Sequence, residues 1–182
     1  MKKYKLILSF VSGCFLLTSC STSPEKYFDV AVLNCNEIAS VLNGAVDREL
    51  ASPSVQLVAG TKDQTEQRKR VEFISERTKF MEDNLKKIKG LNETSDTKNM
   101  LQASVALHEY VLTAMKTEYA QLATLYDQNA PKEQIESLLQ TIQTKYAVRS
   151  GELYDVVLKE GQAYAKKNNI NVTIVNPVPK GI

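Results

Sequence analysis

Histidine is almost absent from this chain: its 182 residues include only one, His108. A hydrolase or transferase commonly needs a positioned histidine base, and di-iron helical proteins need histidines on two helices. The sequence also lacks the zinc-protease pattern HExxH, the redox pattern CxxC and any glycine-rich phosphate-binding loop. We therefore predict a protein that is not an enzyme and that has neither a cofactor nor a metal site.

Glycine (7 residues) and proline (5) are sparse and tryptophan is absent, whereas the helix formers Ala, Leu, Glu, Gln and Lys are abundant. This composition favours an all-α fold. Hydrophobic residues make up 43% of the chain and charged residues 24%, which is typical of a globular protein. The length is sufficient for one domain with a core of its own.

A strong charge of either sign is also missing. The formal net charge is +2, but residues 1–19 contain three lysines and no acidic residue. The remaining chain has 20 basic and 21 acidic residues, a net charge of −1. A near-neutral domain has no electrostatic footprint for nucleic acid, so we expect no nucleic-acid partner.

The first 19 residues have the pattern of a secretory signal peptide. A basic start, Met1 to Lys5, precedes an apolar run from Leu6 to Leu17. The run is shorter than the roughly 20 residues that a helix needs to span a bilayer. Because small polar residues follow it, a cleaved signal fits better than a membrane-anchoring or buried helix.

The residues Leu17-Thr18-Ser19-Cys20 resemble the lipobox of bacterial lipoproteins, an aliphatic residue and two small residues before a cysteine. The resemblance implies that the sulfur of Cys20 receives a diacylglyceryl group and that a peptidase removes residues 1–19. The new amino terminus would then carry a fatty acid such as palmitate. Several acyl chains hold a protein stably on a membrane. The expected partner at Cys20 is therefore the membrane itself.

Ser21 follows the lipobox cysteine, where aspartate commonly retains a lipoprotein at the inner membrane. The resemblance thus implies a cell-envelope protein at the outer membrane, on its periplasmic or surface face. Cys14 would leave with the signal peptide and Cys20 would carry lipid. Cys35 then has no cysteine partner, so no disulfide framework is expected, and we predict a buried thiol on a helix.

Apolar residues recur every three or four positions along the remaining chain, the spacing of amphipathic helices. Ser23-Pro24 predicts the first helix start, and Asp63 with Glu66 predicts the second through a capping box. Gly90 and Pro131 mark later boundaries. The expected helices cover about 24–50, 63–89, 94–128 and 131–169, and the last should bend near Gly151 or Gly161.

These helices predict an up-down-up-down four-helix bundle, with a long, self-associating two-helix coiled coil as the competing arrangement. The chain then divides into a signal peptide (1–19), a lipidated tether (20–23), the bundle (24–169) and a short extended C-terminal tail (170–182). Since the first helix leaves the anchor, its far end and the 51–63 connection should lie away from the membrane.

The 51–63 connection contains Val55, Leu57 and Val58, which exceed what a polar turn requires. Either they cover the far end of the helical core, or they form a partner-contact loop, since irregular segments on rigid scaffolds often bind.

The main functional hypothesis is a noncatalytic, lipid-anchored envelope protein whose helices serve an interaction or structural role, with an envelope protein as candidate partner. Beyond the lipobox, the chain resembles uncharacterised helical-bundle surface lipoproteins in architecture alone, which transfers no binding residue. The alternative is a small-molecule-binding or sensory bundle with a cavity near His108, which otherwise is a core or boundary residue.

Overall fold

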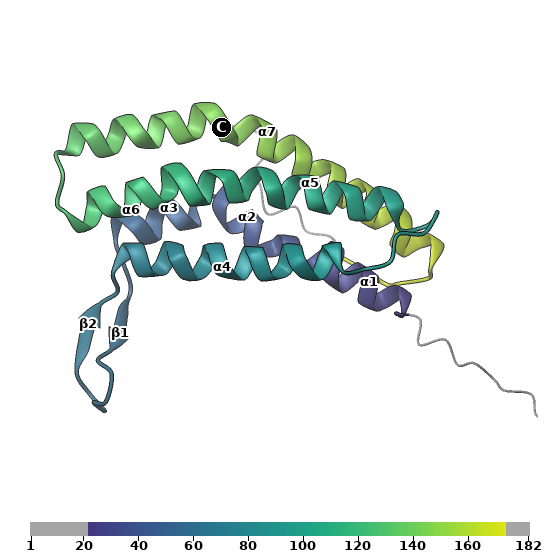
Figure 1. Ribbon diagram of the computed structural model, residues 1–182, viewed down its shortest axis with the longest axis horizontal. Helices are drawn as coiled ribbons and strands as arrows, with labels where there is room; N and C mark the ends of the chain where they lie inside the picture. Colours follow the sequence, from purple (N-terminus) through teal and green to yellow (C-terminus); the bar gives the residue numbers. More distant parts are fainter. Residues whose placement is uncertain (1–21, 174–182) are drawn as a thin grey trace, which may run out of the picture.

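The computed structural model describes residues 22–173 and is mostly helical, with 73% helix and a single two-stranded sheet (Figure 1). The all-α class predicted from composition and periodicity is confirmed. Cys20, the signal peptide and most of the 170–182 tail lie outside the described residues.

The first predicted helix begins where expected but is not continuous. Ser23 caps it by accepting the backbone N–H of Lys26 at 3.3 Å, and Pro24 occupies the first turn. The turn before the last helical segment contains Gly44 in the left-handed region, at a φ of 72°. The prediction of one helix over 24–50 is thus wrong: the segments are α1 (Pro24–Ala31), the 3-10 turn η1 (Leu33–Cys35), α2 (Asn36–Leu42) and α3 (Ala45–Ala51).

The predicted helix start at Asp63 and Glu66 is also wrong. Residues on both sides of this point form an antiparallel hairpin of β1 (Val55–Leu57) and β2 (Thr65–Gln67), with Glu66 inside the second strand. The turn between the strands contains Gly60 at a φ of 81°, a conformation that glycine adopts readily. A capping box requires helical backbone after the cap, which pairing of β2 with β1 prevents.

The remaining helices follow the predicted boundaries closely. α4 (Arg70–Lys89) ends at Gly90, as expected. The third predicted helix comprises α5 (Lys98–Ala114), the π-helical turn η2 (Met115–Tyr119) and α6 (Ala120–Asp127). α7 (Lys132–Lys167) follows Pro131 as one α-helix of 36 residues, and its axis changes direction partway along (Figure 1).

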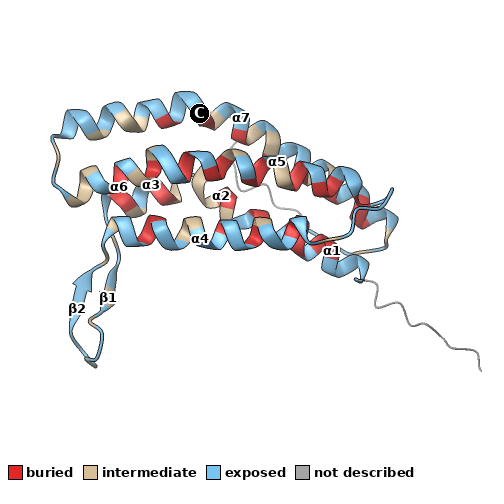
Figure 2. Cartoon of the chain, in the orientation of Figure 1, coloured by how far each residue is buried: buried red, intermediate tan, exposed pale blue. Residues whose placement is uncertain are grey.

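The core lies between the inward faces of the helices, where buried positions gather (Figure 2). α5 packs against both α4 and α7, and α1 and α2 also contact α7. Gly161 of α7 allows a close approach to α1, since a Cβ there would lie 2.8 Å from Cγ2 of Val32. The largest fully buried side chains include Tyr154, Phe28, Ile38, Leu50, Met81 and Met115.

The elongated helical body has two distinct ends (Figure 1). At one end lie the start of α1, the connection between α4 and α5, and the end of α7. At the other end lie the hairpin and the connection between α6 and α7. We call them the α1 end (residues 22–28, 86–98 and 162–173) and the hairpin end (residues 45–69 and 124–136).

Candidate functional site

The β1–β2 hairpin projects from the helical body into solvent (Figures 1 and 2). Val55 and Leu57 on β1 remain 66% and 61% exposed, although valine and leucine are normally buried. Val58 is half-buried within the turn. Val55 and Leu57 are too exposed to cover the end of the helical core, so only the half-buried Val58 fits that alternative.

The hairpin has two chemically different faces. Directly opposed residues of an antiparallel pair share a face, and here Val55 pairs with Gln67 and Leu57 with Thr65. This face carries no charge, and we call it the uncharged hairpin face. The opposite face holds Gln56, whose amide donates to Glu66 at 3.4 Å.

The base of the hairpin is fixed to the helices on both sides. The Glu49 carboxylate at the end of α3 accepts the Ser54 backbone N–H at 2.9 Å and its hydroxyl at 2.7 Å. Both hydrogen bonds lower the pKa of Glu49. Nε of Arg70, the first residue of α4, donates to the Leu50 carbonyl at 2.6 Å. The two helices that flank the hairpin are thereby held together.

Arg68 joins the end of β2 to the side of α4. Its backbone N–H donates to the Ser54 carbonyl at 3.0 Å, closing the hairpin base. Its guanidinium pairs with Glu76 and lies 5.2 Å from the centre of the Phe73 ring. An isolated two-stranded hairpin is marginally stable in water, so these contacts supply what the strands alone lack.

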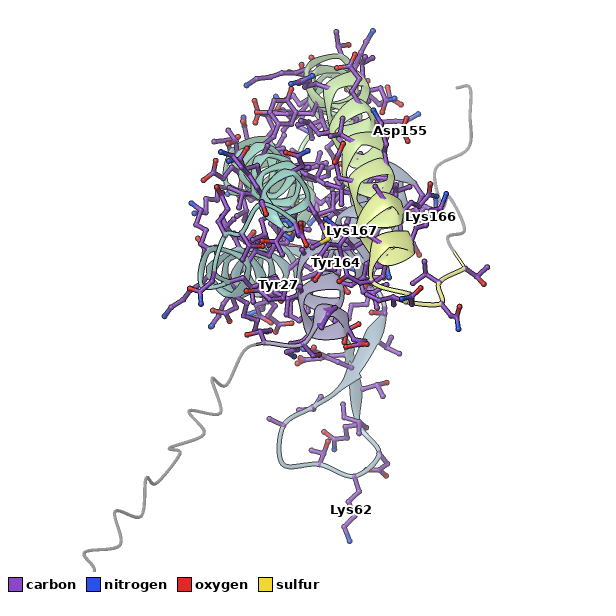
Figure 3. The ribbon with its side chains drawn as sticks, turned by 90° about the vertical axis from the view of Figure 1, so that its right-hand side faces the viewer. Tyr27, Lys62, Asp155, Tyr164, Lys166 and Lys167 are labelled. Atoms are coloured by element: carbon purple, nitrogen blue, oxygen red, sulfur yellow. The ribbon has the colours of Figure 1, made fainter. Side chains whose placement is uncertain are left out.

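The turn of the hairpin is closed by hydrogen bonds of its own. The Val58 N–H donates to the Gln64 carbonyl at 2.8 Å, and the Thr61 hydroxyl donates to the Val58 carbonyl at 2.7 Å. Lys62 lies at the tip, away from the helices (Figure 3). Within residues 22–173, neither strand has a second strand as neighbour, so both outer edges can pair with another chain.

His108 is a buried residue of α5 and lies apart from the hairpin. Its Nδ1 is 2.8 Å from the Ser104 carbonyl, and its Nε2 contacts no hydrogen-bonding partner in the described structure. Burial lowers the pKa of His108, which favours the neutral ring. No group of three or more His, Cys, Asp or Glu side chains placed to hold a metal occurs among the described residues.

Cys35 lies in the same part of the core. Its Sγ lies 3.3 Å from the Ala31 carbonyl and 3.6 Å from Oγ of Ser104. Burial raises the pKa of its thiol to about 12, so the reactive thiolate is suppressed at neutral pH. The structure thus places Cys35 as the buried thiol that its helical position predicts.

A shallow groove of about 480 Å³ opens between α4 and η2, at a place that no sequence pattern indicated. Two ion pairs flank it, Lys79 with Asp83 at 2.7 Å and Lys116 with Glu82 at 2.5 Å. The groove forms where α4 meets the π-helical turn, which a hydrophobic repeat does not reveal. Its lining residues are Val71, Ile74, Ser75, Thr78, Lys79, Glu82, Asp83, Met115, Lys116 and Ala120.

The π-helical turn also carries a polar clamp onto α7 that sequence reasoning missed. The Glu118 carboxylate accepts hydrogen bonds from Lys145 at 2.6 Å, from the Tyr146 hydroxyl at 2.8 Å and from Thr117. Partial burial raises the pKa of Glu118, but these hydrogen bonds outweigh it and bring the pKa to about 2. The Tyr110 ring meets Tyr146 edge-on at 5.6 Å. We interpret the clamp as structural.

Comparison with known proteins finds no matching family model, no matching curated protein and no matching solved structure. Among residues 22–173, no helix has both the length and the hydrophobicity needed to cross a membrane.

Proposed function

We propose that this chain is a noncatalytic protein of the cell envelope, anchored by lipid at Cys20, whose hairpin contacts a protein partner. The observation that carries the proposal is the exposure of Val55 and Leu57 on a hairpin that projects from the helical body. Exposed apolar side chains gathered on one face are typical of interaction surfaces. The base contacts of Glu49, Arg68 and Arg70 present that face in a fixed orientation.

The proposed scaffold is the up-down-up-down four-helix bundle that the sequence predicts, with α1 to α3 in the place of one helix. In such a bundle the helix that starts next to the anchor delivers the hairpin to the opposite end. The hairpin is then the part farthest from the membrane. The lipobox resemblance and Ser21 support the outer membrane as the location.

Site-specific photo-crosslinking in intact cells tests the partner contact. A photoreactive residue at Leu57 should give a discrete adduct with another envelope protein, and Val55→Thr should abolish that adduct. Val148 on α7 is the matched control, because it is also an exposed apolar residue, at 74%. Equal adducts from both positions, or none from Leu57, would reject the hairpin as a contact surface.

The anchor is tested separately by Cys20→Ala. This substitution should abolish incorporation of labelled fatty acid and release the protein from membranes, because the acyl chains are the proposed attachment. Ser21→Ala is the control and should leave labelling intact. Membrane retention by the Cys20→Ala protein would rule out the lipid anchor.

The groove between α4 and η2 favours a second candidate function, small-molecule binding or sensing. Its size falls within the range of ligand sites, and its lining combines apolar and charged side chains. Isothermal titration of the protein with envelope metabolites would test it. A ligand that uses the groove should lose affinity in a Thr78→Trp variant and retain it in a Val148→Trp variant.

A further inference from the structure

The two ends of the molecule differ in charge. The α1 end contains seven lysines and three acidic residues, whereas the hairpin end contains five basic and seven acidic residues. Both ends are made of segments distant in sequence, so only the folded chain brings these charges together. The lysines of the α1 end are Lys26, Lys86, Lys87, Lys89, Lys98, Lys166 and Lys167.

Within the described part of the chain, three of these lysines make neither an ion pair nor a side-chain hydrogen bond, whereas Lys87 donates to Oδ1 of Asn84 at 3.3 Å. Lys89, Lys98 and Lys167 pair with Glu109, Glu93 and Asp96. Within the described part of the chain, Lys26, Lys86 and Lys166 are exposed and have no acidic side chain at ion-pair distance. They come from α1, α4 and α7, so three different helices contribute positive charge to this end.

Polar contacts join the three segments of the α1 end to one another. The Tyr27 hydroxyl donates to the Asn92 carbonyl at 3.0 Å and joins α1 to the connection between α4 and α5. Lys167 joins α7 to the same connection through Asp96 at 2.6 Å. Figure 3 views this end and shows Tyr27 and Tyr164 near its middle with Lys167 beside Tyr164, whereas Lys166 lies on the opposite side of α7. The segments therefore form one surface.

We propose that the α1 end rests on anionic lipid headgroups of the membrane that holds Cys20. This inference rests on the lipid anchor proposed above. Only Ser21, Thr22 and Ser23 separate Cys20 from Pro24, the first residue of α1. Three residues reach about 10 Å at full extension, close to the distance over which physiological salt screens charges. Exposed lysines held that near an anionic surface are attracted to it.

Contact between the α1 end and the membrane gives the protein a fixed orientation, whereas a tether alone would let it rotate freely. With the lysine-rich end on the membrane, the hairpin end faces away from it. The hairpin end carries two more acidic than basic residues, so the membrane field does not favour the inverted orientation.

Chemical attachment to vesicles tests this orientation without relying on acylation in cells. A chain starting at Cys20 is coupled through that thiol to maleimide-bearing lipid. Cys35 does not compete, since it is buried and its pKa is about 12. The vesicles contain phosphatidylcholine alone or with 30% phosphatidylglycerol, and amine acetylation read by mass spectrometry reports the exposure of each lysine.

On the anionic vesicles we expect acetylation of Lys26, Lys86 and Lys166 to slow at least fivefold relative to neutral vesicles. Lys62, at the hairpin tip, is the internal control and should react at the same rate on both. If each of the four lysines reacted at the same rate on anionic and on neutral vesicles, the proposal would be overturned. So would selective protection of Lys62.

Charge-removal variants provide the matched control. The uncoupled chain with Cys20 replaced by alanine should cosediment with anionic vesicles, and Lys26→Gln/Lys86→Gln/Lys166→Gln should weaken that binding about tenfold. Lys62→Gln/Lys69→Gln/Lys132→Gln removes the same charge from the hairpin end and should leave binding unchanged. Equal weakening by both sets would mean non-specific attraction and reject the oriented surface.

The vesicle experiments and the test of acylation at Cys20 can succeed or fail independently. If Cys20 proves not to be acylated in cells while the vesicle experiments succeed, the lysine-rich end remains a membrane-binding surface. If Cys20 is acylated and the lysines stay equally reactive, the anchor stands and the orientation is rejected.

Discussion

The carboxylate of Asp127, the last residue of α6, caps the start of α4 at Arg70. It accepts the backbone N–H of Arg70 at 3.2 Å and that of Val71 at 3.0 Å, and it lies 3.3 Å from the Arg70 guanidinium. The cap comes from a residue 57 positions away from Arg70. It fixes the helix that follows the hairpin, while Arg70 in turn holds the end of α3.

Asp127→Ala should therefore destabilise the protein by about 1–2 kcal/mol, because two N–H groups at a helix start lose their acceptor. Urea unfolding followed by circular dichroism would measure the change. Asp127→Asn keeps a side-chain oxygen and should cost less. Asp83→Ala removes an exposed ion pair with Lys79 and should cost less than either Asp127 variant, because solvent screens the pair. A loss no larger than that of Asp83→Ala would show that the cap contributes little.

Gly161→Ala should destabilise the contact between α7 and α1. The added methyl would lie 2.8 Å from Cγ2 of Val32, and overpacking of this kind typically costs about 1–3 kcal/mol. Combining it with Val32→Ala removes the clash and should recover part of the loss in thermal unfolding.

Gly151→Ala is the control for helix propensity. A Cβ at Gly151 meets no atom within 4 Å, so alanine should stabilise this helix by about 0.5–1 kcal/mol. If the two alanine variants shifted the unfolding temperature equally, close packing at Gly161 would not be the deciding effect.

Acidification should lower the free energy of unfolding because His108 is buried as a neutral ring. Burial lowers the pKa of His108 below its ordinary value of 6.5, so the unfolded chain binds the proton more readily. The stability due to the neutral ring is fully present above pH 6.5 and is lost as the pH falls below it. Unfolding free energies measured between pH 7.5 and 5 should show this decline, and His108→Gln should flatten it. An unchanged slope in that variant would assign the decline to other groups.

Glu118 should contribute in a lower pH window. Its pKa of about 2 lies below the ordinary value of 4.5, so the carboxylate stabilises the fold above pH 4.5 and the contribution is lost as pH falls toward 2. Glu118→Gln should be less stable than the unmodified protein at pH 7, and the two should converge near pH 2. Glu136→Gln, at an exposed pair with Lys132, should show no such convergence. A constant difference at all pH values would exclude the charge of Glu118 as the cause.

The parts of the candidate site that could be predicted depend on residues close together in the sequence. Val55 and Leu57 stood out because a turn does not need them, and they are exposed in the structure. Their placement on a strand was not predictable, since three-residue strands carry too little periodicity to outweigh an apparent capping box. The clamp between Glu118 and Lys145 also gave no signal, because its partners are 27 residues apart and meet only when α7 folds back along α5.

The sequence by itself determined the all-α class, the start of α1 at Ser23-Pro24, the end of α4 at Gly90 and the extents of the last two long helical segments. Each depends on the 3.6-residue repeat or on caps within one turn, both of which are local. Tertiary structure alone decided where α4 begins, because its cap is Asp127, and it decided that the hairpin projects. It also gathered seven lysines from three segments at the α1 end. Such features depend on residues that become neighbours only in the folded chain.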